Sequence, residues 1–140
     1  PSVVFFDEPT AGLDPEERMN FKMCIAEIKK QATVLISTHI VSDVEGICDH
    51  ILILHNGRLA ATGTRKEIEE IARGKVWVVP AEAKRESTEG HWHLINVYEQ
   101  DGQEWMRVLS GEQLAEGKLV QPNVEDGYFC CIRGIGGERR

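Results

Sequence analysis

The feature that most constrains the fold is a short apolar run that ends in two adjacent acids. Residues 2–6 read SVVFF, and Asp7 and Glu8 follow directly. A continuous run of β-branched and aromatic residues is typical of a strand buried on both faces, as in the parallel sheet of an α/β domain. Ligands of such sheets bind just beyond the carboxyl ends of the strands. We therefore expect Asp7 and Glu8 to lie at a binding edge.

A second apolar run, TVLIS at residues 33–37, predicts a parallel strand next to the first, and His39 follows it closely. Adjacent parallel strands would bring His39 to the same edge as Asp7 and Glu8. Two acids and an imidazole at one edge suit phosphoryl transfer. One acid can hold Mg²⁺, often through water, the other can polarise an attacking water, and the imidazole can contact a γ-phosphate.

Between these strands the sequence predicts a helix over residues 13–31. Asp14 is the expected N-cap, Pro15 occupies the first helical position, and Glu17 completes a capping-box pattern. Four apolar residues recur at helical spacing and are expected to face the core: Phe21, Cys24, Ile25 and Ile28.

Further elements follow these two strands. A short helix is predicted over residues 40–48, a hairpin over 50–62 around the Asn56-Gly57 turn pair, and a helix over 64–73 capped by its first residue, a threonine. After Gly74 the pattern changes, and we place a domain boundary there. Residues 1–74 are βαβ-like.

Residues 75–140 are expected to form a small mixed unit of marginal independent stability. Its three predicted strands cover residues 75–79, 94–98 and 104–109. A polar linker over 80–92 separates the first two strands, and a short helix over 123–132 follows the third.

Composition narrows the function further. The formal net charge is −7 and no basic stripe occurs, which argues against nucleic-acid binding. No run of about 18 apolar residues occurs, so we expect no membrane span.

The four cysteines, Cys24, Cys48, Cys130 and Cys131, lack zinc spacing. They indicate a reducing, cytosolic chain, with Cys24 and Cys48 in the core and the adjacent pair packing within a helix. His91 and His93 lack further ligands nearby in the sequence, which argues against a metal site there.

Two segments, VVFFDEPTAGLDP at residues 3–15 and the stretch from TVLISTH to LAATGT at 33–64, carry a family resemblance. They resemble the Walker B strand, D-loop, H-loop and closing hairpin in the C-terminal half of an ABC transporter ATP-binding subunit. The closest subgroup is the bacterial exporter type with a separate membrane permease. Residues 75–131 resemble, less specifically, the small C-terminal extension of that subgroup. The resemblance implies an α/β fold: part of a P-loop NTPase parallel sheet flanked by helices, followed by a mixed α+β extension.

The resemblance also implies roles for single residues. Asp7 would coordinate Mg²⁺ through water, and Glu8 would orient or activate the hydrolytic water. Asp14 would belong to the D-loop that reaches across a nucleotide sandwich dimer, in addition to its cap role. His39 would contact the γ-phosphate of ATP. The implied partners are a second ATP-binding subunit and an integral membrane permease, at the cytoplasmic face of the cell membrane.

The phosphate-binding pattern G-x-x-x-x-G-K-S/T is absent from the sequence. In the family this loop and the LSGGQ signature precede the Walker B strand. We therefore expect a chain truncated at its N-terminus and inactive by itself. The family fold also places the Walker A strand between the strands at 33–37 and 50–54, so the isolated chain should fold poorly. The VLSGEQ stretch at residues 108–113 resembles the signature but lies downstream, and we interpret it as a coincidental turn or helix start.

Two alternatives remain at this point. One is an ABC-family ATPase without a transport role, acting in translation or chromosome maintenance. Such proteins tend to carry coiled-coil arms, tandem ATPase domains or basic surfaces, and the sequence shows none of these. The other is a non-catalytic module, in which the region after Gly74 regulates or dimerises a larger protein.

Overall fold

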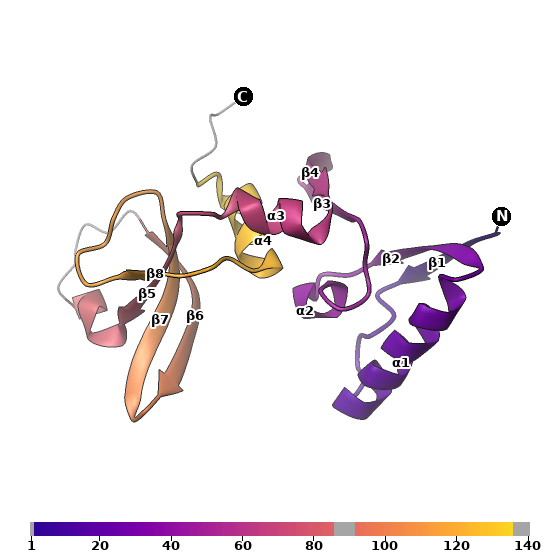
Figure 1. The fold of residues 1–140 in the computed structure, drawn as a ribbon, viewed down its shortest axis with the longest axis horizontal. Coiled ribbons are helices and arrows are strands. Elements are labelled where there is room, and N and C mark those ends of the chain that lie inside the picture. The colour runs from indigo at the N-terminus through magenta and orange to yellow at the C-terminus, as the bar shows by residue number, and fades with distance from the viewer. Residues whose placement is uncertain (1, 86–91, 136–140) are drawn as a thin grey trace. The chain divides into compact units, whose positions relative to one another are not determined.

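The computed structural model describes residues 2–85 and 92–135, and it divides into two compact units, Pro1–Asp49 and His50–Arg140 (Figure 1). Both units mix helices with strands; the first holds a parallel sheet and the second holds antiparallel ones. The α/β class expected from the sequence is therefore confirmed. Among the described helices, none has the length and apolar character needed to cross a membrane.

The first unit is built on a two-stranded parallel sheet. Its elements are β1 (Ser2–Asp7), α1 (Pro15–Ile28), β2 (Ala32–Ser37) and α2 (Val41–Val44). Strands β1 and β2 pair in register from Ser2 opposite Ala32 to Asp7 opposite Ser37. The parallel pairing predicted from the two apolar runs is confirmed, and both strands end at the same edge.

Helix α1 begins where the capping pattern predicts. The Asp14 carboxylate accepts a hydrogen bond from the Glu17 amide at 2.8 Å, and the Glu17 carboxylate accepts one from the Asp14 amide at 2.9 Å. This reciprocal pair satisfies two amides that the first turn leaves without helical partners. Pro15 costs nothing at the first position, since its missing N–H would have no helical acceptor.

The expectation of burial on both faces of β1 is wrong for the described residues. Helix α1 covers one face, where Phe6 meets Phe21 edge to face at 5.7 Å between ring centroids. The opposite face is open, because side chains alternate along a strand and a single helix covers one side. There Val3 is 71% exposed, and Phe5 and Leu35 are exposed as well.

Cys24 also departs from expectation. It is exposed, whereas its neighbour Ile25 is 2% exposed and is the buried residue of α1. One residue of helix turns a side chain by about 100°, so a position next to the centre of the stripe can face away from the core. Cys48 is half-buried, and burial, followed by the charge of Asp49, raises its pKa.

The second unit begins with the hairpin of β3 (Ile51–His55) and β4 (Arg58–Gly63). Asn56 and Gly57 both have positive φ, at 50° and 72°, as a type I′ hairpin turn requires. The turn predicted from this pair is confirmed. Helix α3 (Arg65–Ile71) follows with Thr64 as its N-cap, again in a capping box.

A four-stranded antiparallel sheet in the order β6-β7-β5-β8 completes the second unit. Its elements are β5 (Val76–Pro80), a 3-10 turn η1 (Ala81–Arg85), β6 (Trp92–Gln100), β7 (Gln103–Ser110), β8 (Lys118–Leu119) and α4 (Val124–Arg133). The predicted strands and helix after Gly74 all form. Two clusters of buried residues make its core. One consists of Ala72 (directly after α3), Val76, Leu109 and Cys130, and the other of Trp77, Val79, Met106 and Val108.

Helices α3 and α4 lie side by side, as Figure 1 also shows. Gly127 of α4 sits so close to Ile68 of α3 that an added Cβ would lie 2.0 Å from the Ile68 carbonyl oxygen. Cys130, further along α4, is 3% exposed, which confirms the expected packing role.

The compact units divide between Asp49 and His50, whereas the sequence pattern changes near Gly74. Helix α3 packs on α4, so the hairpin and α3 are compact with the later residues rather than with the first unit. A boundary between compact units and a boundary between family domains need not fall at the same residue. The assignment of 1–74 to one ATPase domain and 75–140 to an accessory domain stays a prediction.

Candidate functional site

The paired ends of β1 and β2 bring the sequence-predicted residues together at one edge. The Ser37 hydroxyl donates a hydrogen bond to the Asp7 carboxylate. The Glu8 amide donates to the Ser37 carbonyl at 2.8 Å, so the pairing continues one residue beyond the strand. Because of this register, Asp7 and Glu8 lie at the same edge of the sheet as the residues that follow β2.

Glu8 faces His39 across this edge. The Glu8 Oε1 atom lies 3.0 Å from His39 Nδ1. Glu8 has φ of 46°, a left-handed conformation that costs a residue with a Cβ of order 1 kcal/mol or more. Such backbone is tolerated where surrounding structure enforces it, and here it turns the chain out of β1 and into the loop that leads to α1.

The second oxygen of Glu8 lacks a hydrogen-bond partner among the described residues, although it is buried. A buried acceptor without a partner is costly and calls for an explanation such as a bound water or ligand. Its neighbour His39 is more accessible, with 76% of its side chain exposed against 37% for Glu8. The pair therefore offers one shielded carboxylate oxygen beside an accessible imidazole.

Asp14 occupies a different place. Its carboxylate and its amide pair with Glu17 at the start of α1, and these are the cap contacts. Its carbonyl accepts the Arg18 amide at 2.9 Å, which begins the helical hydrogen bonding. The cap role is confirmed, whereas a contact across a dimer stays a prediction. The turn from Glu8 to Asp14 is held by the Ala11 amide donating to the Glu8 carbonyl and the Leu13 amide donating to the Thr10 carbonyl, both at 3.2 Å.

The acids at this edge fit the oxygen chemistry of Mg²⁺. This ion prefers one or two carboxylates together with waters and substrate phosphates, rather than a complete cage of side chains. Asp7 is an exposed carboxylate oriented by the Ser37 hydroxyl, and it could hold the ion through water. The shielded oxygen of Glu8 has no described partner and could accept a hydrogen bond from a water. The described residues contain no cluster of three or more histidines, cysteines or acids that could bind a metal unaided.

Sequence reasoning missed three polar residues close to this edge. The Thr10 hydroxyl donates to Asp43, and Arg18 Nη1 lies 3.4 Å from the other oxygen of that carboxylate. Thr10 and Asp43 are 1% and 4% exposed. They lie 33 residues apart, so no local spacing rule could have paired them.

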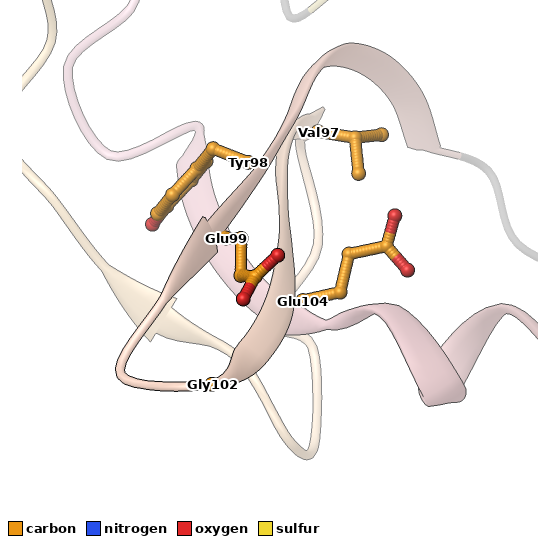
Figure 2. Close-up of a pocket in the computed structure, with 5 residues that line it drawn as sticks. All are labelled: Val97, Tyr98, Glu99, Gly102 and Glu104. Carbon is orange, nitrogen blue, oxygen red and sulfur yellow. The ribbon is translucent and has the colours of Figure 1, made fainter.

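An open depression in the second unit offers no comparable chemistry (Figure 2). Val97, Tyr98, Glu99, Gly102 and Glu104 line it at the turn end of the β6–β7 hairpin. Glu99 and Glu104 are cross-strand partners of like charge. Elsewhere in this unit His93 Nδ1 lies 3.3 Å from Arg133 Nη1, and His91 lies outside the described residues.

Known proteins with similar sequences decide the family. No protein-family model matches the chain. An uncharacterized ABC transporter ATP-binding protein of Synechocystis sp. is 33% identical over an alignment 153 positions long, which covers 97% of this chain and 41% of that protein. The chain belongs to the ABC transporter ATP-binding protein family.

Other ABC proteins support the assignment over shorter stretches. The energy-coupling factor transporter ATP-binding protein EcfA2 of Lactiplantibacillus plantarum is 29% identical over 123 residues, or 86% of this chain and 40% of that protein. ABC transporter A family member 6 of Arabidopsis thaliana is 41% identical over 69 residues, or 49% of this chain and 8% of that protein. The chain thus spans well under half the length of these ABC relatives.

Proposed function

We propose that this chain is part of the ATP-hydrolysing subunit of an ABC exporter that drives transport through a separate membrane permease. The contact between Glu8 Oε1 and His39 Nδ1, at 3.0 Å on the common edge of two parallel strands, is the observation that carries this proposal. It supports a water-orienting acid beside a phosphate-contacting imidazole.

The proposed chemistry divides among four side chains. The shielded Glu8 oxygen accepts a hydrogen bond from the attacking water and orients it, acting as general base. His39 is held through Nδ1 by Glu8 and uses its accessible side to contact the γ-phosphate. Asp7, oriented by Ser37, would hold Mg²⁺ through water. The ion, when bound, neutralises charge that develops on the phosphate oxygens.

A phosphate-binding loop must come from polypeptide other than this sequence, since its pattern does not occur in residues 1–140. We propose that Asp14 contributes to a site shared with a second ATP-binding subunit, and that the assembly sits on the cytoplasmic face of a membrane permease. By itself the 140-residue chain is not expected to hydrolyse ATP.

The test uses the full-length subunit that carries these residues. Glu8→Gln keeps the size and shape of the side chain but removes the base, so it should lose turnover and accumulate an ATP-bound dimer. His39→Ala should lose turnover as well. Glu27→Gln is the matched control, because Glu27 pairs with Lys30 on the exposed surface of α1. ATPase rates that stay unchanged in both site variants would refute the proposed mechanism.

A further inference from the structure

A buried polar cluster in the first unit takes no part in the chemistry proposed above. The Thr10 hydroxyl donates to one oxygen of Asp43, and the Arg18 guanidinium pairs with the other at 3.4 Å. Thr10 and Asp43 are almost fully buried, whereas a third of the Arg18 side chain is exposed. A buried carboxylate is costly unless both oxygens find partners, and here both do. We call Thr10, Arg18 and Asp43 the Asp43 cluster.

The Asp43 cluster joins three segments of the chain near the candidate site. Thr10 follows Glu8 by two residues, and Asp43 follows His39 by four, within α2. Arg18 lies in the first turns of α1, and its Nε atom also donates to the Leu13 carbonyl at 3.2 Å. One carboxylate therefore ties the loop after Glu8 and the start of α1 to the segment after His39.

The contact between Glu8 and His39 cannot maintain its own geometry. An ion pair or hydrogen bond between exposed side chains is weak, because water competes for both groups. His39 is mostly exposed, and the pairing of β1 and β2 has ended before it. A charged hydrogen-bond network in a low-dielectric interior is stronger and more rigid than such a contact.

We propose that Asp43, held by Thr10 and Arg18, is a positioning residue that fixes His39 relative to Glu8. This inference rests on the proposed function, because it assigns the cluster a role through those two side chains. Loss of a partner should let the segment after β2 move, and reaction rates are sensitive to misplacement of even about 1 Å. The effect should fall on turnover rather than on nucleotide binding.

The experiment compares Thr10→Val with Thr10→Ser in the full-length subunit. Valine matches the shape of threonine but lacks the hydroxyl, whereas serine retains it. We expect Thr10→Val to lower kcat at least roughly tenfold while KM for ATP changes less than about twofold. Thr10→Ser should keep most of the turnover. Wild-type kcat in a folded Thr10→Val subunit would overturn the proposal, and so would an equal loss in Thr10→Ser.

Arg18→Gln is the second variant, for the case that Thr10→Val does not fold. Its position is partly exposed and therefore tolerant, and it should also lower kcat with little change in KM. An unchanged kcat in Arg18→Gln would contradict the role of the cluster. Glu8→Gln and His39→Ala, measured in parallel, separate the two proposals. If both of these keep turnover, the proposed function fails; if both lose it while the cluster variants do not, only this inference fails.

Discussion

Replacing Gly127 with alanine tests how closely α3 and α4 must approach. The added Cβ would lie 2.0 Å from the Ile68 carbonyl oxygen and 2.8 Å from its carbonyl carbon. An unstrained non-bonded contact needs about 3.5 Å, so the helices would have to separate by roughly 1.5 Å. Both obstructing atoms belong to the backbone of a helix whose Ile68 is fully buried, so no side-chain rotation relieves the overlap.

Two opposing effects set the magnitude for Gly127→Ala. Alanine is the better helix former by about 1 kcal/mol, which favours the variant. Overpacking a core costs about 1–3 kcal/mol or somewhat more, and an overlap with backbone belongs at the upper end. The net loss in the free energy of unfolding should therefore be about 2 kcal/mol. For a unit of this size that corresponds to a fall in Tm of roughly 8–16 °C.

The assay is urea and thermal denaturation followed by tryptophan fluorescence. The three tryptophans, Trp77, Trp92 and Trp105, all lie in the second unit, so the signal reports on that unit. Gly111→Ala is the matched control, because a Cβ there meets nothing within 4 Å. A Gly127→Ala variant as stable as the unchanged chain would show that helix propensity outweighs packing, and it would refute the reasoning.

Three further predictions concern charge, pH and local stability. Arg107→Ala should cost about 3 kcal/mol by urea denaturation, because it leaves the fully buried Asp126 without its guanidinium partner, whereas Arg73→Ala, on an exposed surface pair, should cost under about 0.5 kcal/mol. Burial raises the pKa of the Cys130 thiol from 9.0 to about 11. Between these values the unfolded thiol has lost its proton and the folded one keeps it, so stability should fall as pH rises from about 9 to 11, and Cys130→Ala should reduce that slope. In hydrogen exchange on the 140-residue chain, β1 and β2 should exchange faster than β5 and β7, because a two-stranded sheet with one open apolar face is only marginally stable.

Each of these predictions can fail independently. Equal costs for Arg107→Ala and Arg73→Ala would mean that the buried pair contributes no more than a surface one. A pH dependence that is the same with and without Cys130 would assign the alkaline loss to other groups. Cooperative, native-like protection of β1 and β2 would contradict the expected poor folding of the isolated chain.

Several features of this fold could be predicted from the sequence because their causes are local. The Asp14 and Thr64 caps depend on residues three positions apart, and the hairpin turn depends on the adjacent Asn56-Gly57 pair. The meeting of Glu8 with His39 needed one further step, the parallel pairing of two apolar runs. Once that pairing is assumed, strand geometry places both residues at the same edge.

Other features were decided only by tertiary structure, because they depend on groups that are distant in the sequence. The carboxylate of Asp43 finds Thr10 from 33 residues away, and Gly127 is constrained by the backbone of Ile68. The exposure of Val3 and Phe5 follows from what packs on each face of the sheet, which hydrophobicity alone does not reveal. A local pattern specifies where an element begins and which residues are apolar. The partner that satisfies a buried charge or covers a sheet face is specified only when the whole chain is packed.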